Sequence, residues 1–184
     1  MIDRGGTRWV TDTSVFTHLA RAGHLGILER LTPNGILVVP SEVNTEIQRS
    51  QELHQGIPLT SSLTWVDIAV LTEEEESTFL AVKMNLGGSA TQHLGESAVI
   101  AVARHRAGVA LLDDRAATRQ ATRLGVTWVD TLWIVIEAYK RLFDHDRQRT
   151  IAVVDDLLET GMYLPVTSGS EIITYAYEEG WLPE

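Results

Sequence analysis

The chain of 184 residues contains no cysteine. This absence excludes a disulfide-stabilised scaffold, catalysis by a thiolate and a zinc site with cysteine ligands. It suits a reducing compartment, so we expect a cytoplasmic protein. Long hydrophobic runs are also missing, since no segment approaches the roughly 18 apolar residues that a membrane helix needs. The opening string MIDRGGTRW lacks the apolar stretch of a signal peptide.

Lysine is scarce as well, because thirteen of the fifteen basic residues are arginine. The formal net charge of -10 argues against a simple nucleic-acid coat protein. However, the acids are concentrated in residues 67–76 and 144–184, and the rest of the chain holds 13 bases against 11 acids. Charge therefore permits a nucleic-acid substrate, and arginine is the better bidentate ligand for phosphate.

Short apolar segments alternate with helical patterns along most of the chain. Buried strands of a few residues between longer helices indicate an α/β fold, in which a parallel sheet is covered on both faces. The predicted strands are Trp9–Thr11, Ile36–Val39, Trp65–Ile68, Val109–Leu112 and Val126–Val129. The strand at Trp65 and the strand at Val126 have the weaker patterns.

The helical patterns are interrupted by glycine, proline and short polar runs. The predicted helices are Val15–Ala22, Leu25–Leu31, Ser41–Ser50, Glu73–Leu86, Gly95–Arg106, Arg115–Leu124, Thr131–Phe143, Thr150–Thr160 and Gly169–Glu179. Ser41 is expected to cap its helix, and Leu53–Ser62 is expected to be a loop. We predict one domain at residues 1–143 and an acidic helical extension at residues 144–184 that packs on it.

Six acids map to one edge of the predicted sheet. In a parallel α/β sheet, ligands bind outside the carboxyl ends of the strands, and the helices that follow begin at the same edge. The acids at strand ends are Asp12, Asp113 and Asp114, and those near helix starts are Glu42, Glu46 and Glu96. Like charges so close together need a cation, because otherwise they destabilise the fold or take up protons. Ligands that are all oxygen favour Mg²⁺ or Mn²⁺, and such sites commonly hydrolyse phosphodiesters.

Each acid also has an ordinary interpretation. Asp12 fits a helix cap, Glu42 a partner of a helix dipole, and Glu46 a solvated helix face. Glu96 is harder to explain in this way, because it shares a helical stripe with the apolar Ile100. One aspartate of the adjacent pair is expected to cap the following helix while the other faces the site. Only the convergence on one edge favours a shared site.

Four strings together resemble the PIN-domain family, most closely its VapC-like branch of bacterial toxin–antitoxin pairs. They are VTDTSVFTHLARAGHLGILERL, VVPSEVNTEI, LGESAVIAVA and ALLDDRAATRQATRLGVTWVDTL, within Trp9 to Leu142. The resemblance implies a three-layer α/β/α sandwich with a central parallel five-stranded sheet. It also implies a metal-dependent endoribonuclease that uses Mg²⁺ or Mn²⁺ to cleave RNA. An inhibiting antitoxin protein and a homodimer are further implications.

The resemblance also assigns roles to individual residues. The implied catalytic acids are Asp12, Glu46, Glu96 and Asp114, of which Asp12, Glu96 and Asp114 are the implied metal ligands. The implied supporting residues are Ser14 near the metal or phosphate, Asp113 as a cap or neighbour of the site, Arg115 and Arg119 as phosphate contacts, and Asp130. Close relatives often carry glycine where this chain has Asp130, and we favour a helix cap for it over membership of the cluster. Glu42 falls outside the family pattern.

Two other functions stay open: a catalytically silent PIN-fold protein that binds or scaffolds, and a nuclease acting on DNA. No residue pattern here is specific for a 2′-hydroxyl. A receiver-like phosphoacceptor would have its acidic pair after the first strand, and a haloacid-dehalogenase phosphatase would have D-x-D there, which DTS lacks. The histidines show no metal-binding spacing, and most of them are expected at the surface. The tryptophans are assigned to packing rather than base stacking, because Trp9, Trp65 and Trp128 fall in predicted strands.

Overall fold

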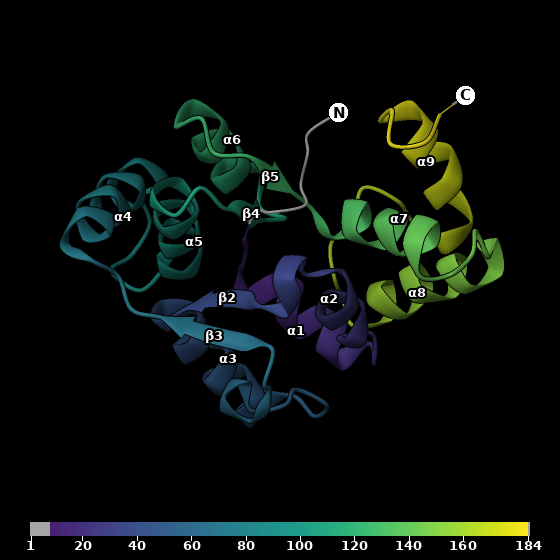
Figure 1. Cartoon of the computed structure of the whole chain (residues 1–184), viewed down its shortest axis with the longest axis horizontal. Coiled ribbons are helices and arrows are strands. Elements are labelled where there is room, and N and C mark those ends of the chain that lie inside the picture. The colour runs from purple at the N-terminus through teal and green to yellow at the C-terminus, as the bar shows by residue number, and fades with distance from the viewer. Residues whose placement is uncertain (1–7, 184) are drawn as a thin grey trace.

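The computed structural model describes residues 8–183, which form a five-stranded sheet flanked by helices (Figure 1). All neighbouring strands are parallel, in the order β3-β2-β1-β4-β5. The strands are β1 Trp9–Thr11, β2 Leu37–Pro40, β3 Val66–Ala69, β4 Val109–Leu111 and β5 Trp128–Val129. The predicted fold class is confirmed, and each predicted strand is present with ends shifted by at most two residues.

Nine α-helices lie within the described part of the chain. They are α1 Thr13–Arg21, α2 Gly26–Leu31, α3 Ser41–Leu53, α4 Glu73–Leu86, α5 Leu94–His105, α6 Arg115–Arg123, α7 Thr131–Arg141, α8 Arg147–Glu159 and α9 Ile172–Glu178. Short 3-10 turns occupy Pro33–Gly35, Thr60–Ser62 and Gly169–Glu171. None of the helices in residues 8–183 has the length and hydrophobicity that crossing a membrane requires.

Helix α3 begins at Ser41 as predicted, but its cap differs from the prediction. Ser41 is already the first helical residue, and Pro40 occupies the cap position without a side-chain hydrogen bond. The Ser41 hydroxyl instead donates to the Glu42 carboxylate at 3.1 Å. The reason is that β2 ends at Pro40 and the helix follows at once, which leaves no residue between them for a polar cap. The capping prediction for Ser41 is therefore wrong, while Glu42 lies in the first turn, where its charge suits the helix dipole.

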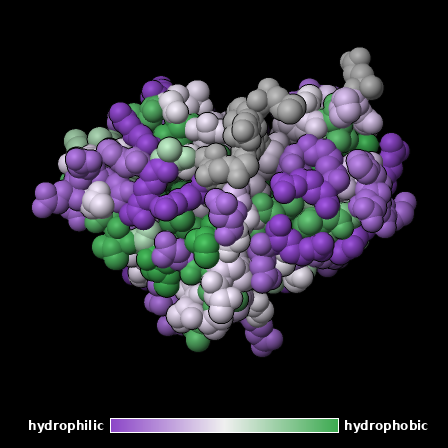
Figure 2. Space-filling model, in the orientation of Figure 1, coloured by the Kyte–Doolittle hydropathy of each residue, from purple (hydrophilic) through white to green (hydrophobic). Residues whose placement is uncertain are grey.

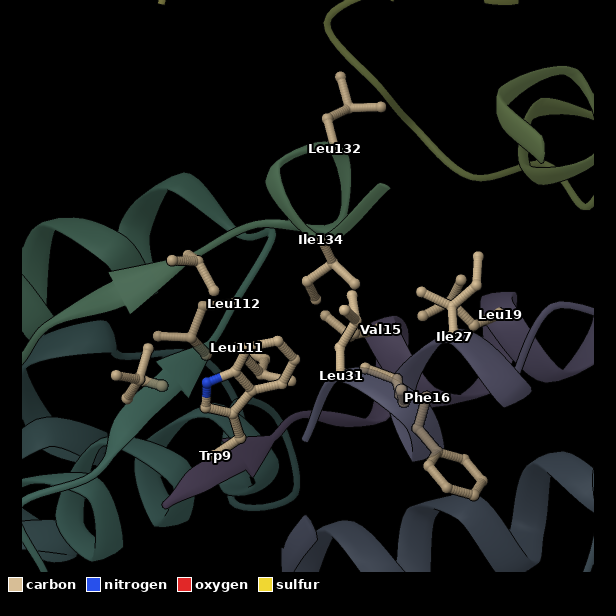
Figure 3. Close-up of a cluster of buried hydrophobic side chains, with 14 of the residues drawn as sticks. Trp9, Val15, Phe16, Leu19, Ile27, Leu31, Leu111, Leu112, Leu132 and Ile134 are labelled. Carbon is tan, nitrogen blue, oxygen red and sulfur yellow. The ribbon is translucent and has the colours of Figure 1, made fainter. Parts of the chain in front are cut away.

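The inner strands are buried on both faces, as expected for a parallel sheet between helix layers. Figure 3 shows part of this core, where side chains from β1, β4, α1, α2 and α7 come together. Trp9 is buried there, with its ring edge-on to Trp133 at a centroid distance of 6.1 Å. Leu132, at the start of α7, points away from this cluster toward the C-terminal segment (Figure 3).

The strand order creates a switch point between β1 and β4. The chain runs outward from β1 to β2 and β3, then returns to the other side of β1 as β4 and β5. Connections that leave β1 and β4 diverge, which opens a crevice at their carboxyl ends. The Asp12 backbone N–H donates to the Leu111 carbonyl at 3.2 Å, so the ends of these two strands are held side by side.

Helices α8 and α9 pack beside α7 at one end of the molecule (Figure 1). Arg21 donates to the Thr160 carbonyl at 2.9 Å, and His18 Nδ1 lies 2.6 Å from the Thr160 hydroxyl. His24 Nε2 pairs with Asp156 at 2.6 Å. These contacts attach the end of α8 to α1 and the turn after it. His18 and His24 are therefore partly buried and contact the extension, while His54, His105 and His145 are exposed.

Candidate active site

A cavity of about 630 Å³ opens at the carboxyl ends of β1 and β4. Seven of the residues named from the sequence line it: Asp12, Ser14, Glu96, Asp113, Asp114, Arg115 and Asp130. Glu42 and Arg119 are not among its lining residues, and Glu46 lies close enough to interact with Asp12. The structure thus brings most of the predicted site residues to one crevice from segments that are far apart in the sequence.

Asp12 is almost fully buried, with 4% of its surface exposed. It caps α1, since its Oδ1 accepts a hydrogen bond from the Val15 N–H at 2.8 Å. Burial raises the pKa of Asp12 well above its usual value, and the nearby charge of Asp113 raises it further. The charges of Glu96 and Glu46 act in the same direction. The cap interpretation is correct, but it accounts for one oxygen of a carboxylate that three other acids surround.

One aspartate of the adjacent pair caps the following helix, as the residue pattern predicts. Asp114 is exposed and caps α6, because its Oδ1 accepts from the Ala117 N–H at 2.8 Å. Asp113 turns instead to the start of α7, where its two oxygens accept from the Thr131 N–H at 2.9 Å and hydroxyl at 2.8 Å. Burial raises the pKa of Asp113. The interpretation of Asp113 as the cap of the helix that begins at Arg115 is therefore wrong. Asp114, the residue directly before Arg115, caps that helix.

Glu46 is held in place by two donors from distant segments. The Thr13 hydroxyl donates to one carboxylate oxygen, and the Gly95 N–H donates to the other at 3.2 Å. A Cβ at position 95 would lie 2.6 Å from Glu46 Oε2, so a larger residue there would displace the Glu46 carboxylate from its present position. A freely solvated helix face is thus the wrong interpretation of Glu46. Thr13 and Gly95 belong to the DTS and GE strings, but no sequence signal linked them to Glu46.

Glu96 lies in the first turn of α5 and is partly buried. Its Oε1 is 3.5 Å from His93 Nδ1. His93 occupies the cap position of α5 in the left-handed region, with φ 58°. Sequence reasoning missed His93, because its position beside Glu96 depends on this unusual backbone turn rather than on a recognisable spacing.

Asp130 caps α7 by accepting from the Trp133 N–H at 2.7 Å, which confirms the predicted cap. Burial raises its pKa to about 6, with smaller contributions from Asp113 and Glu179. Asp130 also lines the cavity. The same side chain therefore caps α7 and adds to the negative charge of the cavity.

No arginine or lysine within residues 8–183 forms an ion pair with any acid of this cavity. Arg115 is exposed at the cavity, where it is available to a ligand. The protein therefore leaves most of the negative charge of the cluster uncompensated. Such a cluster has the charge and the oxygen chemistry that a divalent cation needs.

The acids do not form a ready-made metal cage. Across residues 8–183, no group of three or more His, Cys, Asp or Glu side chains lies close enough together to hold a metal ion as they stand. Mg²⁺ typically binds through only one or two carboxylates and keeps several waters. Asp12 with either Asp113 or Glu96 would meet that smaller requirement, so the donor set fits such an ion.

Comparisons with known proteins complete the description. The DUF3368 family model, described as PIN domain, matches residues 8–178. Among solved structures, one similar chain is the crystal structure of PAE2754 from Pyrobaculum aerophilum, with 14% identity. The match covers 68% of this chain and 95% of that one, with a TM-score of 0.39. A search of curated proteins finds no match.

Proposed function

The chain belongs to the PIN-domain family, and on this premise we propose that it is a metal-dependent endoribonuclease of the VapC-like branch. PIN domains are generally nucleases that use divalent ions. The observation that carries the proposal is the uncompensated acid cluster at the switch point of the sheet, centred on the buried Asp12. Perturbed titratable groups in a cleft of this kind are typical of catalytic sites.

The chain's own residues have distinct roles in this proposal. Asp12, with Asp113 or Glu96, would hold the ion. When bound, a divalent ion supplies a water of lowered pKa and polarises a phosphoryl oxygen. Thr131 fixes the orientation of Asp113 through two hydrogen bonds. Arg115 has no ion pair within the described residues and would contact the phosphate.

Glu46 is the implied acid with the best-defined orientation, because both of its oxygens accept from the protein. In that position it adds negative charge beside Asp12 rather than filling the cavity itself. Ser14 lines the cavity two residues after Asp12 and would donate its hydroxyl to a phosphate oxygen.

We extend the proposal to a type II toxin that forms a homodimer and is inhibited by a small antitoxin protein. Figure 2 shows apolar residues exposed around β3. Ile68 of β3 and Val70 directly after it are exposed, and so are Leu80 and Met84 on α4. Exposed apolar residues gathered in one area are typical of protein interfaces.

A cleavage assay tests the nuclease proposal. Labelled single-stranded RNA, structured RNA and matching DNA are incubated with Mg²⁺, Mn²⁺ or EDTA. We expect metal-dependent RNA cleavage that falls by about 1,000-fold or more in Asp12→Asn and Glu96→Gln. Asp144→Asn and Glu76→Gln are matched controls, because both acids are exposed and lie outside the cavity.

The other outcomes separate the alternatives. Cleavage of DNA but not RNA would support the nuclease activity and show that its substrate is DNA. Cleavage that is equal in wild type and all four variants, or that persists in EDTA, would contradict a carboxylate–metal site. No cleavage together with no heat of metal binding in calorimetry would favour a silent PIN-fold protein that only binds.

A further inference from the structure

A second group of cavity-lining residues is aromatic or apolar and comes largely from the C-terminal extension. Met162, Tyr163, Leu164 and Pro165 belong to the connection between α8 and α9, and Tyr175 lies in α9. Trp128 of β5 lines the same cavity. Residues 162–165 and Tyr175 lie outside the four strings that resemble PIN domains, yet they form a wall of the acidic crevice.

The connection after α8 holds Tyr163 outward. Residues alternate along it, because Met162, Leu164 and Val166 are buried while Tyr163 is 89% exposed. This period of two is that of an extended chain with one face anchored in the core. Within residues 8–183, Tyr163 has no hydrogen bond or ring contact. The backbone of Tyr163 is thus held by its buried neighbours, its ring contributes little to packing, and the residue lines the cavity.

Trp128 presents a second aromatic surface. Its side chain is 37% exposed, and its indole N–H donates to the Thr122 hydroxyl at 3.0 Å, which fixes the ring. Packing, the role predicted for this tryptophan, accounts for only part of its surface, because β5 is an edge strand and leaves it at the crevice. Trp128 and Tyr163 line the same cavity, and their rings do not contact each other.

We propose that Tyr163 and Trp128 form a stacking subsite for an unpaired nucleobase beside the acid cluster. The proposal deepens the proposed function and rests on it. Carboxylates in the cavity repel phosphate, so contacts that do not depend on charge add to the affinity that a bound ion and Arg115 would supply. Aromatic stacking supplies such contacts for any base. A base inside a duplex is already stacked, so this subsite selects single-stranded nucleotides.

A basic peptide is the competing occupant, because acids attract it. Arg115 and Thr118 argue for the nucleic acid, since they line the same crevice at the start of α6. A guanidinium repels a basic peptide, whereas a guanidinium and a hydroxyl both bind phosphate oxygens. The crevice thus combines ring faces for a base with donors for the phosphate next to it.

Binding without cleavage tests the subsite directly. We would measure fluorescence anisotropy of a short labelled single-stranded RNA in EDTA and in Ca²⁺, and repeat it with DNA. Tyr163→Ala should weaken binding about 10- to 100-fold, whereas Tyr163→Phe should bind like wild type because the ring remains. Tyr177→Ala is the matched control, since Tyr177 is also exposed on the extension but does not line the cavity.

Two probes distinguish stacking from a structural role. A 2-aminopurine placed at successive positions should be quenched at one position in wild type and not in Tyr163→Ala. An abasic nucleotide at that position should bind wild type as weakly as the intact RNA binds the variant. Equal binding of unpaired RNA and DNA supports a subsite that reads the base rather than the sugar.

The failures are separable. Metal-dependent cleavage with Tyr163→Ala binding and cleaving like wild type overturns the subsite and leaves the nuclease in place. Binding that depends on Tyr163 without any cleavage supports the subsite and removes the nuclease. An arginine-rich peptide that binds through Tyr163 while no RNA or DNA binds overturns the subsite in favour of a protein ligand.

Discussion

Glu75 and Asp12 are both buried acids, but the protein surrounds them in opposite ways. Glu75 is 1% exposed and accepts two hydrogen bonds from the Arg106 guanidinium, at 2.7 and 2.9 Å. It also accepts from the Thr72 N–H at 2.9 Å in a capping box. These bonds, above all those from Arg106, hold the pKa of Glu75 below its usual value. The pKa of Asp12 is raised, because burial and other carboxylates oppose its charge.

The difference separates an acid that serves the fold from an acid kept for a ligand. A buried charge that only stabilises structure is paired by the protein itself, since an unpaired one is costly. Asp12 bears that cost, and so does Asp113. The cost is relieved when a cation enters, and for this reason unpaired buried acids in a cleft indicate a binding site.

Replacing each acid by its amide should have the largest and most different effects on stability at these two positions. Glu75→Gln leaves the half-buried Arg106 without its anion, so we expect the free energy of unfolding to fall by about 2–4 kcal/mol. Asp12→Asn keeps the cap on Val15, because asparagine caps as well as aspartate, and removes the repulsion. At pH 7 it should be at least as stable as wild type. Urea unfolding measures both values.

The two variants should also differ in activity. Glu75→Gln should retain nuclease activity per folded molecule, since Glu75 does not line the cavity. A loss of stability in Asp12→Asn at pH 7 would show that a group of the protein compensates Asp12, and the comparison would then fail. Any gain in Asp12→Asn should shrink at low pH, where the wild-type carboxyl is also neutral.

Much of the fold follows from local sequence patterns. The buried runs at Trp9, Leu37 and Val109 each predict a strand, and Gly87, with φ 72°, ends α4 where the sequence places the stop. The order of the strands does not follow from any local pattern, because it depends on how all the helices pack. The start of α3 was predicted at the right residue, but its cap was not, since a strand ending in proline left no room for a side-chain cap.

The positions of the acids could be predicted, because strand ends and helix starts share one edge of a parallel sheet. Their partners could not. The contact of Glu46 with Thr13 and Gly95 joins three distant segments. Which of the two adjacent aspartates caps α6 depends on whether the helix begins one residue earlier or later. Tyr163 lies in a connection whose place beside the cavity depends on the folded extension.

Asp130 is a further unpaired acid, and its effect on stability should be smaller and should depend on pH. Its folded pKa is about 6, against 3.8 for an ordinary aspartate. Between these values the folded protein keeps a proton that the unfolded chain has lost, so the contribution of Asp130 to stability falls as pH rises from about 4 to 6. Asp130→Asn keeps the cap on Trp133 and should be more stable than wild type above pH 6, by up to about 3 kcal/mol.

Urea unfolding of both proteins from pH 3 to pH 8 measures this difference. The two should be equally stable near pH 3, where the wild-type side chain is protonated in both states, and should diverge through pH 4 to 6. A difference that is constant over the whole range would mean that the substitution acts through packing rather than through the charge. Asp130 would then belong with the structural acids.

Substitution of Asp114 should have the smallest effect on stability, so Asp113 and Asp114 can be compared by their effects on cleavage. It is exposed, and Asp114→Asn preserves the bond to the Ala117 N–H, so the free energy of unfolding should change by less than about 0.5 kcal/mol. Asp114→Ala should lose about 1 kcal/mol with the cap. Because Asp113 acts on Asp12 directly, Asp113→Asn should reduce cleavage more than Asp114→Asn does. A larger loss in Asp114→Asn, at unchanged stability, would instead assign the metal to the exposed acid, as the family resemblance implies.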